Sequence, residues 1–387
     1  MKLKEICEYI YDRVAVTVVS EENYISTENM AQNKGGVTRS SSIPTSGAVI
    51  RYKNDDILIS NIRPYFKKIW QADKTGGCSA DVLCIRAKEH IDSTFLYYLL
   101  SQDAFFEYVM MGAKGCKMPR GDKGHIMDWE IDIPEDKSEQ TAIGQCLKVI
   151  DKKIEINRQI NDNLEQQAQA LYKSWFVDFE PFKDGRFVES ELGLIPKGWS
   201  TGSIYKYVNV IYGAPYKSTL FNENKEGYPL IRIRDLKTFS PQFYTTEVLP
   251  QTEYIKSGDV VAGMDAEFIP CLWQGETGVL NQRCCKFVGK DKEINNLFVL
   301  HLVKPELEYV QSYKTGTTVS HLGKADIDRF IVILPDEAIV HQFSKICRPL
   351  LDEQNKCAVE IRRLTNLRDA LLPKLMSGEL KINEIDC

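Results

Sequence analysis

The stretch Tyr52-Lys-Asn-Asp-Asp-Ile-Leu58 recurs 203 residues later as Ile255-Lys-Ser-Gly-Asp-Val-Val261. At the same offset Trp70 matches Trp273, and Phe95-Leu-Tyr-Tyr-Leu99 matches Phe298-Val-Leu-His-Leu302. The offset then falls slowly to 200, where Ala170-Leu-Tyr matches Ala370-Leu-Leu. Self-similarity at a fixed period indicates a repeated structural unit. We therefore expect a tandem duplication of a unit of about 200 residues.

Each repeat begins with a segment that combines helical and β-strand sequence patterns. Helical patches at 93–111 and 294–312 lie among short β-rich runs that are bounded by turn residues. The runs are AVIRY (48–52), DILIS (56–60) and VLCIRA (82–87) in the first repeat, and LIRIR (230–234), DVVAG (259–263) and RCCKFV (283–288) in the second. This alternation predicts a compact α+β, or mixed α/β, domain in each repeat.

A long amphipathic helix is expected to follow each domain. After Pro134, with Ser138 as the expected N-cap, apolar residues fall at 143, 147, 150 and 154 and again at 164, 168, 171 and 175. A continuous helix over 138–176 would be ~58 Å long. The second copy, 338–376, repeats the pattern, although Pro349 should kink or restart it. Two such helices from one duplicated chain predict an antiparallel coiled-coil pair between two pseudo-twofold-related domains.

Asn157 and Asn161 interrupt the heptad seam of the first helix. The interpretation that we favour is a local rotation of the apolar stripe onto Ile156 and Ile160, because 3.6 residues per turn do not divide a seven-residue repeat. The alternative is that buried asparagines fix the register of the helices.

Domain boundaries follow from these elements. We expect a first globular domain, a helix, a linker with a second globular domain, a second helix and a flexible tail, at 1–136, 137–180, 181–336, 337–380 and 381–387.

Composition describes a folded and reduced protein. The N-terminus lacks the apolar core of a signal peptide, and no run of 18 apolar residues occurs, so we expect a soluble, cytoplasmic protein without a membrane role. The eleven cysteines form no CxxC pair, which favours free thiols over disulfides and argues against a metal site.

Net charge gives no support for nucleic-acid binding. The chain carries −5 overall, residues 1–134 hold 17 basic and 18 acidic side chains, and residues 181–335 hold 18 of each. If DNA is bound, local clusters of basic residues or partner subunits must supply the positive charge.

Two motifs carry a resemblance to a known family. Ala170-Leu-Tyr-Lys-Ser-Trp-Phe-Val-Asp-Phe-Glu-Pro-Phe182 with Glu191-Leu-Gly-Leu-Ile-Pro-Lys-Gly-Trp199 resembles the central conserved region of specificity subunits of type I restriction–modification enzymes. Ala370-Leu-Leu-Pro-Lys-Leu-Met-Ser-Gly-Glu-Leu380 resembles their distal conserved region. The likeness extends over nearly the whole chain, because domain order and helix positions agree with the family.

The resemblance implies a non-catalytic subunit that recognises a bipartite, asymmetric site in double-stranded DNA. It also implies that the helices set the distance between the half-sites and dock two adenine methyltransferase subunits, to which motor and nuclease subunits can be added. S-adenosylmethionine, ATP and magnesium are then expected in the partner subunits, and no cofactor in this chain. The sequence contains neither an Asn/Asp-Pro-Pro-aromatic methyltransferase motif nor a GxxxxGK[ST] loop, in agreement with this expectation.

Candidate DNA contacts in the first domain lie in three loops. Basic residues beside glycine and aromatic neighbours can approach phosphates, and arginine can also read guanine edges. The alternative for each is an ordinary solvated surface. The candidates are Arg39 in a polar loop with Thr38, Ser40 and Ser41; Arg63, Tyr65, Lys67 and Lys68 after the strand DILIS; and Lys114, Lys117, Arg120 and Lys123 in a Gly-rich loop.

The second domain offers a similar set. Arg232 and Arg234 alternate on the expected strand and should face the same side of it, which would suit a DNA groove. Polar residues then occupy the loop equivalent to 115–123, where we interpret His321 as a polar loop residue rather than a catalyst. The candidates are Arg232, Arg234, Lys237, Thr317, Thr318, Ser320, His321 and Lys324.

Aromatic and leucine residues at the helix ends are candidates for a partner interface. For Trp175 and Phe176, packing against the chain's own second domain and docking of a methyltransferase stay open as alternatives. The full set is Trp175, Phe176, Phe179, Leu371, Leu372 and Leu375. Trp70 and Trp273 are expected in the domain cores rather than stacked on bases.

Other functions also stay open. The chain could serve a methyltransferase-only system or another bipartite restriction system, or it could be a coiled-coil scaffold without a DNA role. A self-sufficient nuclease or methyltransferase is a further alternative, and it predicts turnover by the purified chain alone.

Overall fold

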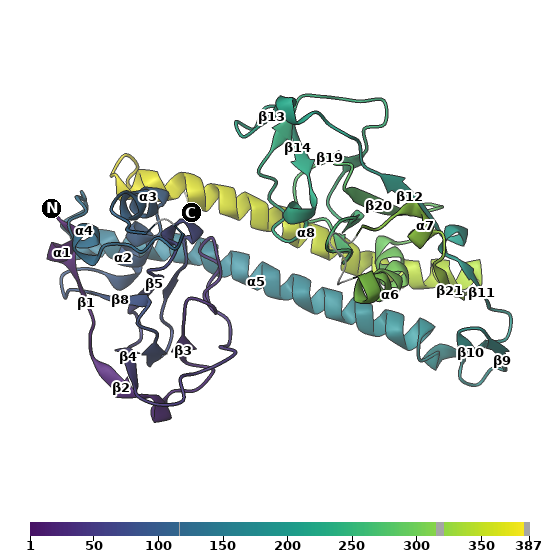
Figure 1. The fold of residues 1–387 in the computed structure, drawn as a ribbon, viewed down its shortest axis with the longest axis horizontal. Helices are drawn as coiled ribbons and strands as arrows, with labels where there is room; N and C mark the ends of the chain where they lie inside the picture. The colour runs from purple at the N-terminus through teal and green to yellow at the C-terminus, as the bar shows by residue number, and fades with distance from the viewer. Residues whose placement is uncertain (116, 315–320, 383–387) are drawn as a thin grey trace. The chain divides into compact units, whose positions relative to one another are not determined.

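The computed structural model describes residues 1–115, 117–314 and 321–382 (Figure 1). The chain forms two compact units. Unit 1 is Met1–Lys153 together with the chain from Leu364 onward, and unit 2 is Ile154–Arg363. Each unit therefore contains one mixed α/β domain and a part of each long helix, α5 (Lys137–Phe176) and α8 (Glu337–Met376). The expected continuous helix over 138–176 is confirmed, and so is the mixed helix-and-strand fold.

The described part of unit 1 has four short helices besides its segments of α5 and α8. They are α1 (Leu3–Ile6), α2 (Ser93–Leu100), α3 (Asp103–Met111) and α4 (Lys123–Met127). Its strands are β1 (Cys7–Tyr9), β2 (Arg13–Ala15), β3 (Tyr24–Ile25), β4 (Ala48–Tyr52), β5 (Ile57–Ser60), β6 (Ile69–Gln71), β7 (Gly76–Cys78) and β8 (Val82–Ala87). They form two four-stranded sheets, ordered β1-β8-β5-β6 and β2-β4-β7-β3.

Unit 2 has the helices α6 (Asn296–Lys314) and α7 (Lys324–Ile327). Its strands are β9 (Phe187–Ser190), β10 (Gly193–Pro196), β11 (Ser200–Ser203), β12 (Val208–Tyr212), β13 (Phe221–Asn222), β14 (Tyr228–Ile231), β15 (Tyr244–Thr245), β16 (Tyr254–Ile255), β17 (Val260–Gly263), β18 (Cys271–Leu272), β19 (Gly278–Leu280), β20 (Cys284–Gly289) and β21 (Ile331–Leu334). One sheet is ordered β12-β20-β17-β18 and another β13-β15-β14-β19-β16, and β9 with β10 and β11 with β21 form separate pairs.

The duplication is visible in the sheets. The order β1-β8-β5-β6 in unit 1 corresponds to β12-β20-β17-β18 in unit 2, and every neighbouring pair in both sheets is antiparallel. A buried aspartate directly precedes β5 and β17, and it forms the same hydrogen bond in both units. Asp56 accepts a hydrogen bond from the Lys53 N–H at 2.7 Å, and Asp259 accepts one from the Lys256 N–H at 2.9 Å. The repeated sequence therefore encodes a repeated turn, because a carboxylate at this position caps the turn from within.

The two aspartates are neutralised by basic residues that do not occupy equivalent positions in the two repeats. Arg86 donates two hydrogen bonds to Asp56, at 2.6 and 2.7 Å, whereas Lys286 lies 2.9 Å from Asp259. Buried carboxylates need such partners, because an unpaired charge in the interior is costly.

The start of α5 differs from expectation. Asp136, and not Ser138, caps the helix, because its Oδ1 accepts a hydrogen bond from the Ser138 N–H at 2.9 Å and its Oδ2 accepts one from the Ser138 hydroxyl at 2.6 Å. Of the two expected effects of Pro349, a kink or a restart, the restart does not occur, since α8 runs through this residue. Pro349 is exposed, so water can reach the Lys345 carbonyl that loses its helical donor.

The two helices run antiparallel within each unit. In unit 2 Asn157 contacts Glu360 and Asn161 contacts Gln354, so that the numbering rises on α5 as it falls on α8. In unit 1 Arg368 donates to Asp151 at 2.8 Å, and Asp151 also accepts the Tyr98 hydroxyl at 2.7 Å.

The favoured interpretation of the helical seam is wrong. Asn157 and Asn161 are 1% and 5% exposed, whereas Ile156 and Ile160 are 40% and 37% exposed. The stripe does not rotate onto the isoleucines, because Glu360 and Gln354 on α8 face the asparagines with polar groups. The asparagines therefore occupy the seam itself.

Each unit has its own apolar core. That of unit 1 gathers α1, α2, α3 and the sheet residues around Phe95, and Leu372 and Leu375 of α8 close it. That of unit 2 is built around Phe298 and Phe343. The nine cysteines among the described residues are free thiols, as expected, and they are buried or half-buried. Burial raises the pKa of several, to about 12 at Cys285, which keeps them protonated and unreactive.

Candidate nucleic-acid interface

Two loops of unit 1 that the sequence singled out lie against each other. Residues 61–68 follow strand β5, and residues 112–122 join α3 to α4. The Arg63 N–H donates to the Pro119 carbonyl at 2.8 Å, and Ile62 and Arg120 form a β-bridge. We call these segments loop pair 1. Its basic residues at 63–68 and at 114–120 therefore belong to one surface region, and Lys123 follows at the start of α4.

The backbone of loop pair 1 is held in an unusual conformation. Arg63 and Lys67 have φ of 50° and 51°, in the left-handed region, and they flank a 3₁₀ turn at Pro64–Phe66. A neighbouring segment braces this turn, because the N–H groups of Asn33 and Lys34 donate to the carbonyls of Phe66 and Lys67, both at 2.9 Å. Left-handed residues other than glycine persist only where surrounding contacts fix them. The turn leaves Tyr65 46% exposed.

Three of the six basic residues of loop pair 1 are paired with acids. The ion pairs are Lys67 with Asp103 at 2.9 Å, Lys114 with Asp122 at 2.6 Å and Arg120 with Asp81 at 3.1 Å. The Lys114 ammonium, followed by the backbone N–H of His125, lowers the pKa of Asp122 to about 2. These acids offset the charge of the cations.

Three other lysines of this region have no acid partner among the described residues. Lys117 is exposed, and Lys123 lies 5.3 Å from the ring centre of Tyr11. Lys68 donates to the Thr27 carbonyl at 2.6 Å, and burial lowers its pKa. Arg39 lies in a different loop, and its side chain forms ion pairs with Glu21 at 2.7 Å and with Glu22 at 3.3 Å.

Unit 2 builds an equivalent arrangement. Residues 264–270 follow strand β17, which corresponds to β5, and Asp265 forms a β-bridge with His321 as Ile62 does with Arg120. The Leu322 N–H donates to the Met264 carbonyl at 2.7 Å, and His321 Nδ1 lies 2.6 Å from Asp265 Oδ1. We call residues 264–270 and 321–324 loop pair 2. Thr317, Thr318 and Ser320 lie outside the described residues.

A lysine–aspartate ion pair spans the second loop in both units. Lys314, the last residue of α6, lies 2.6 Å from Asp326 in α7, as Lys114 lies 2.6 Å from Asp122. Lys314 also donates to the His321 carbonyl at 2.7 Å. The two units therefore hold corresponding loops with corresponding ion pairs.

The expectation that Arg232 and Arg234 share one strand face is wrong. Strand β14 ends at Ile231, and residues Ile233–Leu236 form a 3₁₀ turn. Asp235 causes the turn, because its carboxylate accepts a hydrogen bond from the Arg232 N–H at 2.9 Å. Arg232 lies half-buried 4.2 Å from the ring centre of Phe243, whereas Arg234 is exposed.

Sequence reasoning missed two cations that the structure adds. Arg283 lies 3.3 Å from Asp265 in loop pair 2, where Lys237 also reaches Glu267 at 2.7 Å. Lys34 joins Lys67 on Asp103, at 3.1 Å. Arg283 and Lys34 do not lie in basic runs, so only their positions in the sequence could have identified them. Arg283 begins the β-rich run RCCKFV, and Lys34 precedes a Gly-Gly pair. Lys324 is exposed and has no ion pair among the described residues.

Some of the candidates for a partner interface are buried in the cores of their own units. Phe176, Leu372 and Leu375 are 4%, 5% and 0% exposed within the cores of their own units. Trp175, Phe179 and Leu371 are only partly buried. Burial of Phe176 favours the packing alternative for this residue. Trp273 is fully buried, and Trp70 packs half-buried against Tyr52, as expected of core residues.

The family model for the type I restriction modification DNA specificity domain matches residues 1–166 and 196–361. The chain belongs to this family. The two matched segments correspond to the two repeats, and recognition of a bipartite DNA target is the role of such specificity subunits. None of the helices in the described ranges has the length and apolar character needed to cross a membrane.

Individual relatives agree with the family. The type I restriction enzyme MjaIX specificity subunit of Methanocaldococcus jannaschii is 27% identical over 326 residues, which cover 77% of this chain and 71% of that protein. The HindI specificity subunit of Haemophilus influenzae is 26% identical over 405 residues, which cover 85% and 87%. The crystal structure of the S subunit of a type I restriction–modification system from M. genitalium has the same fold, with a TM-score of 0.55 at 16% identity over 97% and 95% of the two chains.

Proposed function

We propose that loop pairs 1 and 2 are the DNA-reading surfaces of this specificity subunit, and that each reads one half of a split, asymmetric sequence. The observation that supports this most strongly is the repeated geometry: the Ile62–Arg120 and Asp265–His321 bridges occupy corresponding places in the two units. Different side chains on the two loop pairs would give the two half-sites different sequences.

Within each loop pair we assign two roles. Exposed lysines such as Lys117 and Lys324 contact phosphates, because a flexible ammonium needs only a nearby negative charge. Arg120 and Arg63, whose main chains are fixed by the contact between the two loops, present guanidinium groups to base edges. We retain Lys67, Lys68, Lys114, Lys123, Arg232, Arg234, Lys237 and His321, with Thr317, Thr318 and Ser320, as secondary contacts, and Arg39 as a peripheral one.

Pairing of cations with acids has a consequence for DNA binding. A phosphate that approaches Lys67, Lys114 or Lys237 must compete with a carboxylate already in place. Binding to arbitrary DNA is therefore weakened, since the non-specific term depends on uncompensated positive charge. Base contacts can then account for a larger share of the discrimination between sequences.

We further propose that residues 1–136 and 181–336 act as exchangeable recognition domains and that the helical segments 137–180 and 337–380 space the half-sites. The helices would dock two adenine methyltransferase subunits, with Trp175, Phe179 and Leu371 at the contact because they are only partly buried. Phe176, Leu372 and Leu375 would support that surface from below. The chain would be non-catalytic and cofactor-free, with S-adenosylmethionine, ATP and magnesium bound by partner subunits in the cytoplasm.

The test is to map methylated adenines in a genome that expresses this chain with its methyltransferase. We expect a two-part motif with a fixed gap. Replacing residues 1–136 by the equivalent segment of a relative should change one half of the motif only, and replacing residues 181–336 should change only the other half. A change of both halves after either replacement would contradict independent reading.

A separate control addresses catalysis. The purified chain should neither methylate nor cleave DNA with S-adenosylmethionine or magnesium unless its partner is added. Turnover by the chain alone would overturn the non-catalytic assignment without affecting the motif experiment.

A further inference from the structure

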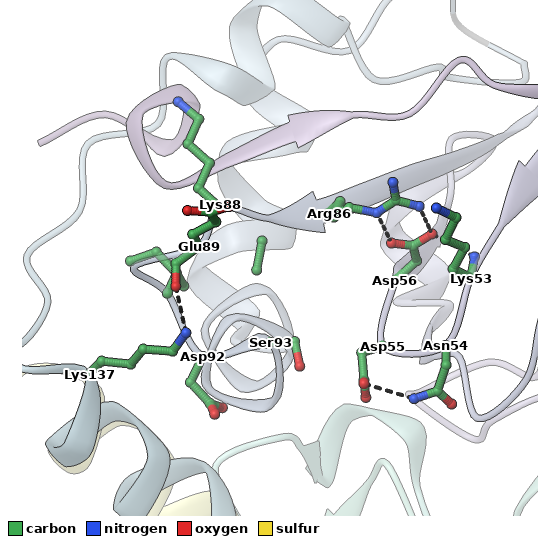
Figure 2. Close-up of a pocket in the computed structure, with 12 residues that line it drawn as sticks. Lys53, Asn54, Asp55, Asp56, Arg86, Lys88, Glu89, Asp92, Ser93 and Lys137 are labelled. Carbon is green, nitrogen blue, oxygen red and sulfur yellow. Dashed lines mark hydrogen bonds and ion pairs between the residues drawn. The ribbon is translucent and has the colours of Figure 1, made fainter.

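The N-terminal ends of α5 and α8 pack against equivalent loops of units 1 and 2. The side chains that make these contacts carry different charges in the two units. In unit 1 the first turn of α5 meets the loop between β8 and α2, where the Lys137 ammonium donates to the Glu89 carbonyl and the Thr141 hydroxyl donates to Asp92 at 3.0 Å. Figure 2 shows this lysine at one side of a cavity of about 420 Å³. A cation therefore joins helix and loop in unit 1.

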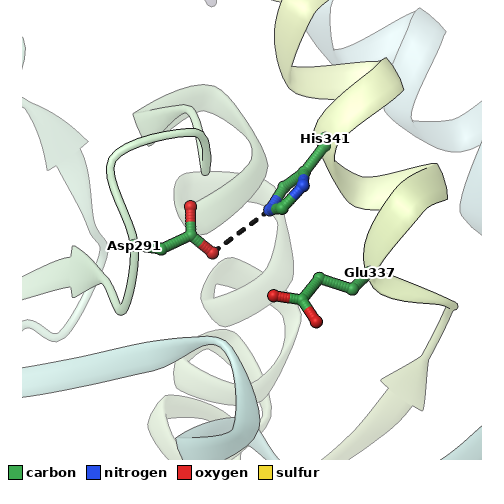
Figure 3. A group of neighbouring side chains, drawn as sticks. All are labelled: Asp291, Glu337 and His341. Atoms are coloured by element: carbon green, nitrogen blue, oxygen red, sulfur yellow. Dashed lines mark hydrogen bonds and ion pairs between the residues drawn. The ribbon is translucent and has the colours of Figure 1, made fainter.

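At the corresponding positions of unit 2 the chain carries different chemistry. Glu337 and His341, which are 200 residues after Lys137 and Thr141, lie in the first two turns of α8 and face Asp291 in the loop between β20 and α6 (Figure 3). One ligand atom from each of the three side chains lies within 4.8 Å of the others. His341 Nε2 is 3.1 Å from Asp291 Oδ2. The ammonium of unit 1 is thus replaced by a carboxylate.

The three side chains are oriented by their surroundings. Asp291 Oδ1 accepts backbone hydrogen bonds from Glu293 at 2.7 Å and Ile294 at 3.2 Å, which leaves Oδ2 directed at the histidine. The other ring nitrogen of His341, Nδ1, lies 3.4 Å from Glu293 Oε2. A carboxylate at Nδ1 selects the tautomer whose Nε2 carries the free lone pair, which is the arrangement found behind metal-binding histidines. The i, i+4 spacing of Glu337 and His341 puts both on one face of the helix.

We propose that Asp291, Glu337 and His341 form a binding site for a divalent transition-metal ion of the zinc class. The ion replaces the Lys137 ammonium as the cation that joins the helix to the loop. One imidazole and two carboxylates carry a charge of −2 when the histidine is neutral, and a divalent ion balances it. The imidazole nitrogen selects transition metals over magnesium and calcium, which prefer oxygen ligands alone. Water completes the coordination shell, since three protein ligands leave a position open.

The competing arrangement is a protonated His341 that forms ion pairs with Asp291 and Glu293. It requires no metal, and it predicts that Glu337 contributes only through its favourable position at the start of a helix. The experiment below separates the two arrangements, because only the metal site depends on all three side chains together.

The probe is Co²⁺, followed by its visible absorption and by isothermal titration into the full chain, first stripped with chelator. We expect one Co²⁺ per chain, displaced by Zn²⁺ and not by millimolar Mg²⁺, with visible bands typical of nitrogen and oxygen ligands. Binding should be lost in His341→Ala. Glu337→Lys, which restores the cation of unit 1, should also lose it. Glu293→Ala should weaken affinity about 10- to 100-fold, as expected for the partner behind a ligating histidine.

His90→Ala is the matched control, because His90 is exposed and lies in the equivalent loop of unit 1; it should bind Co²⁺ as the parent chain does. Circular dichroism establishes that each variant is folded. The metal site is overturned if the parent chain binds no Co²⁺, or if His341→Ala and Glu337→Lys bind it as tightly as the parent. A near-ultraviolet charge-transfer band of thiolate origin would also overturn it, since the ion would then sit on cysteine.

Discussion

The Asn157 side-chain amide donates a hydrogen bond of 2.8 Å to Glu360 in the buried seam between α5 and α8 of unit 2. One turn further along α5 the pairing is incomplete. Both polar atoms of the Asn161 side chain, and Oε1 of Gln354, are buried without a hydrogen-bond partner among the described residues. A satisfied polar layer thus lies beside an unsatisfied one, and the two should respond in opposite ways to substitution.

Removing the unsatisfied layer should stabilise unit 2. In Asn161→Leu/Gln354→Met, two buried polar groups become apolar side chains of similar volume, so their desolvation cost disappears. We expect the free energy of unfolding to rise by about 1–3 kcal/mol, measured by urea denaturation followed by circular dichroism.

The matched control is Asn157→Leu, which breaks the satisfied layer. It should lower the free energy of unfolding by about 1.5–3 kcal/mol, because the bond to Glu360 involves a charged acceptor. Destabilisation by the Asn161/Gln354 double variant would show that the bond from Gln354 Nε2 to the Asn161 carbonyl outweighs the cost of burying these polar groups.

Acidification should destabilise unit 2 through His301. Burial, followed by repulsion from Lys304, lowers the pKa of His301 from 6.5 to about 4. The unfolded state then binds the proton more tightly, so stability is complete above pH 6.5 and falls as the pH drops toward 4. Between pH 7.5 and pH 5 we expect a loss of about 2 kcal/mol from this residue.

His301→Phe isolates the effect. The ring packs near Tyr172, and its Nε2 has no hydrogen-bond partner among the described residues, so phenylalanine can take its place. Urea unfolding of the variant at pH 7.5 and 5.0 should show a smaller difference than that of the parent. Equal pH dependence in both would assign the acid sensitivity to other groups.

Lys117 and Lys324 should contribute to DNA binding through phosphates alone. In complex with the methyltransferase, Lys117→Ala and Lys324→Ala should each reduce the slope of log affinity against log salt by about 0.9. The weakening should be equal on the cognate and on an unrelated duplex, as measured by fluorescence anisotropy. Lys74→Ala, outside both loop pairs, is the control and should leave the slope unchanged. A selective loss on the cognate duplex would instead assign a base contact.

Asp81→Asn should strengthen DNA binding. The carboxylate lies 3.1 Å from Arg120, and its loss frees a cation and removes repulsion of phosphate. The fold of the loop should survive, because the Asn61 N–H bonds to the backbone carbonyl of residue 81, not to its side chain. We expect about two- to fivefold tighter binding at low salt, with an unchanged methylation motif. Weaker binding would show that Asp81 is needed to position Arg120.

Local patterns in the sequence predicted the repeated architecture well. Strands at 48–52, 57–60 and 82–87 lie where β-rich runs are bounded by turn residues, and the repeat itself located their counterparts in unit 2. One of the failures has a non-local cause, and the other is caused by a side chain three residues away. Nothing near Asn157 announces Glu360, which is 203 residues away, and Asp235 converts the expected strand at Arg232 into a turn.

The candidate interface was predictable in outline only. A basic loop at 114–123 was evident, and the repeat paired it with 314–324, but the sequence could not show that loops 61–68 and 112–122 meet. It also could not show the acids that pair with the cations, because Asp103 lies 36 residues after Lys67 and Asp81 lies 39 residues before Arg120. Charge counts over whole segments average these local pairs to zero.

The ion pairs Lys114–Asp122 and Lys314–Asp326 bear on how such a chain changes over generations. Each pair ties together the two ends of a segment that we assign to sequence reading, and neither needs the residues in between to do so. Mutation or recombination between the two residues of an ion pair can therefore alter the preferred DNA sequence while the ion pair still holds the ends of the segment together. The duplicated chain thus separates the residues that preserve folding from those free to diversify, and a new specificity can arise in one half while the other half still works.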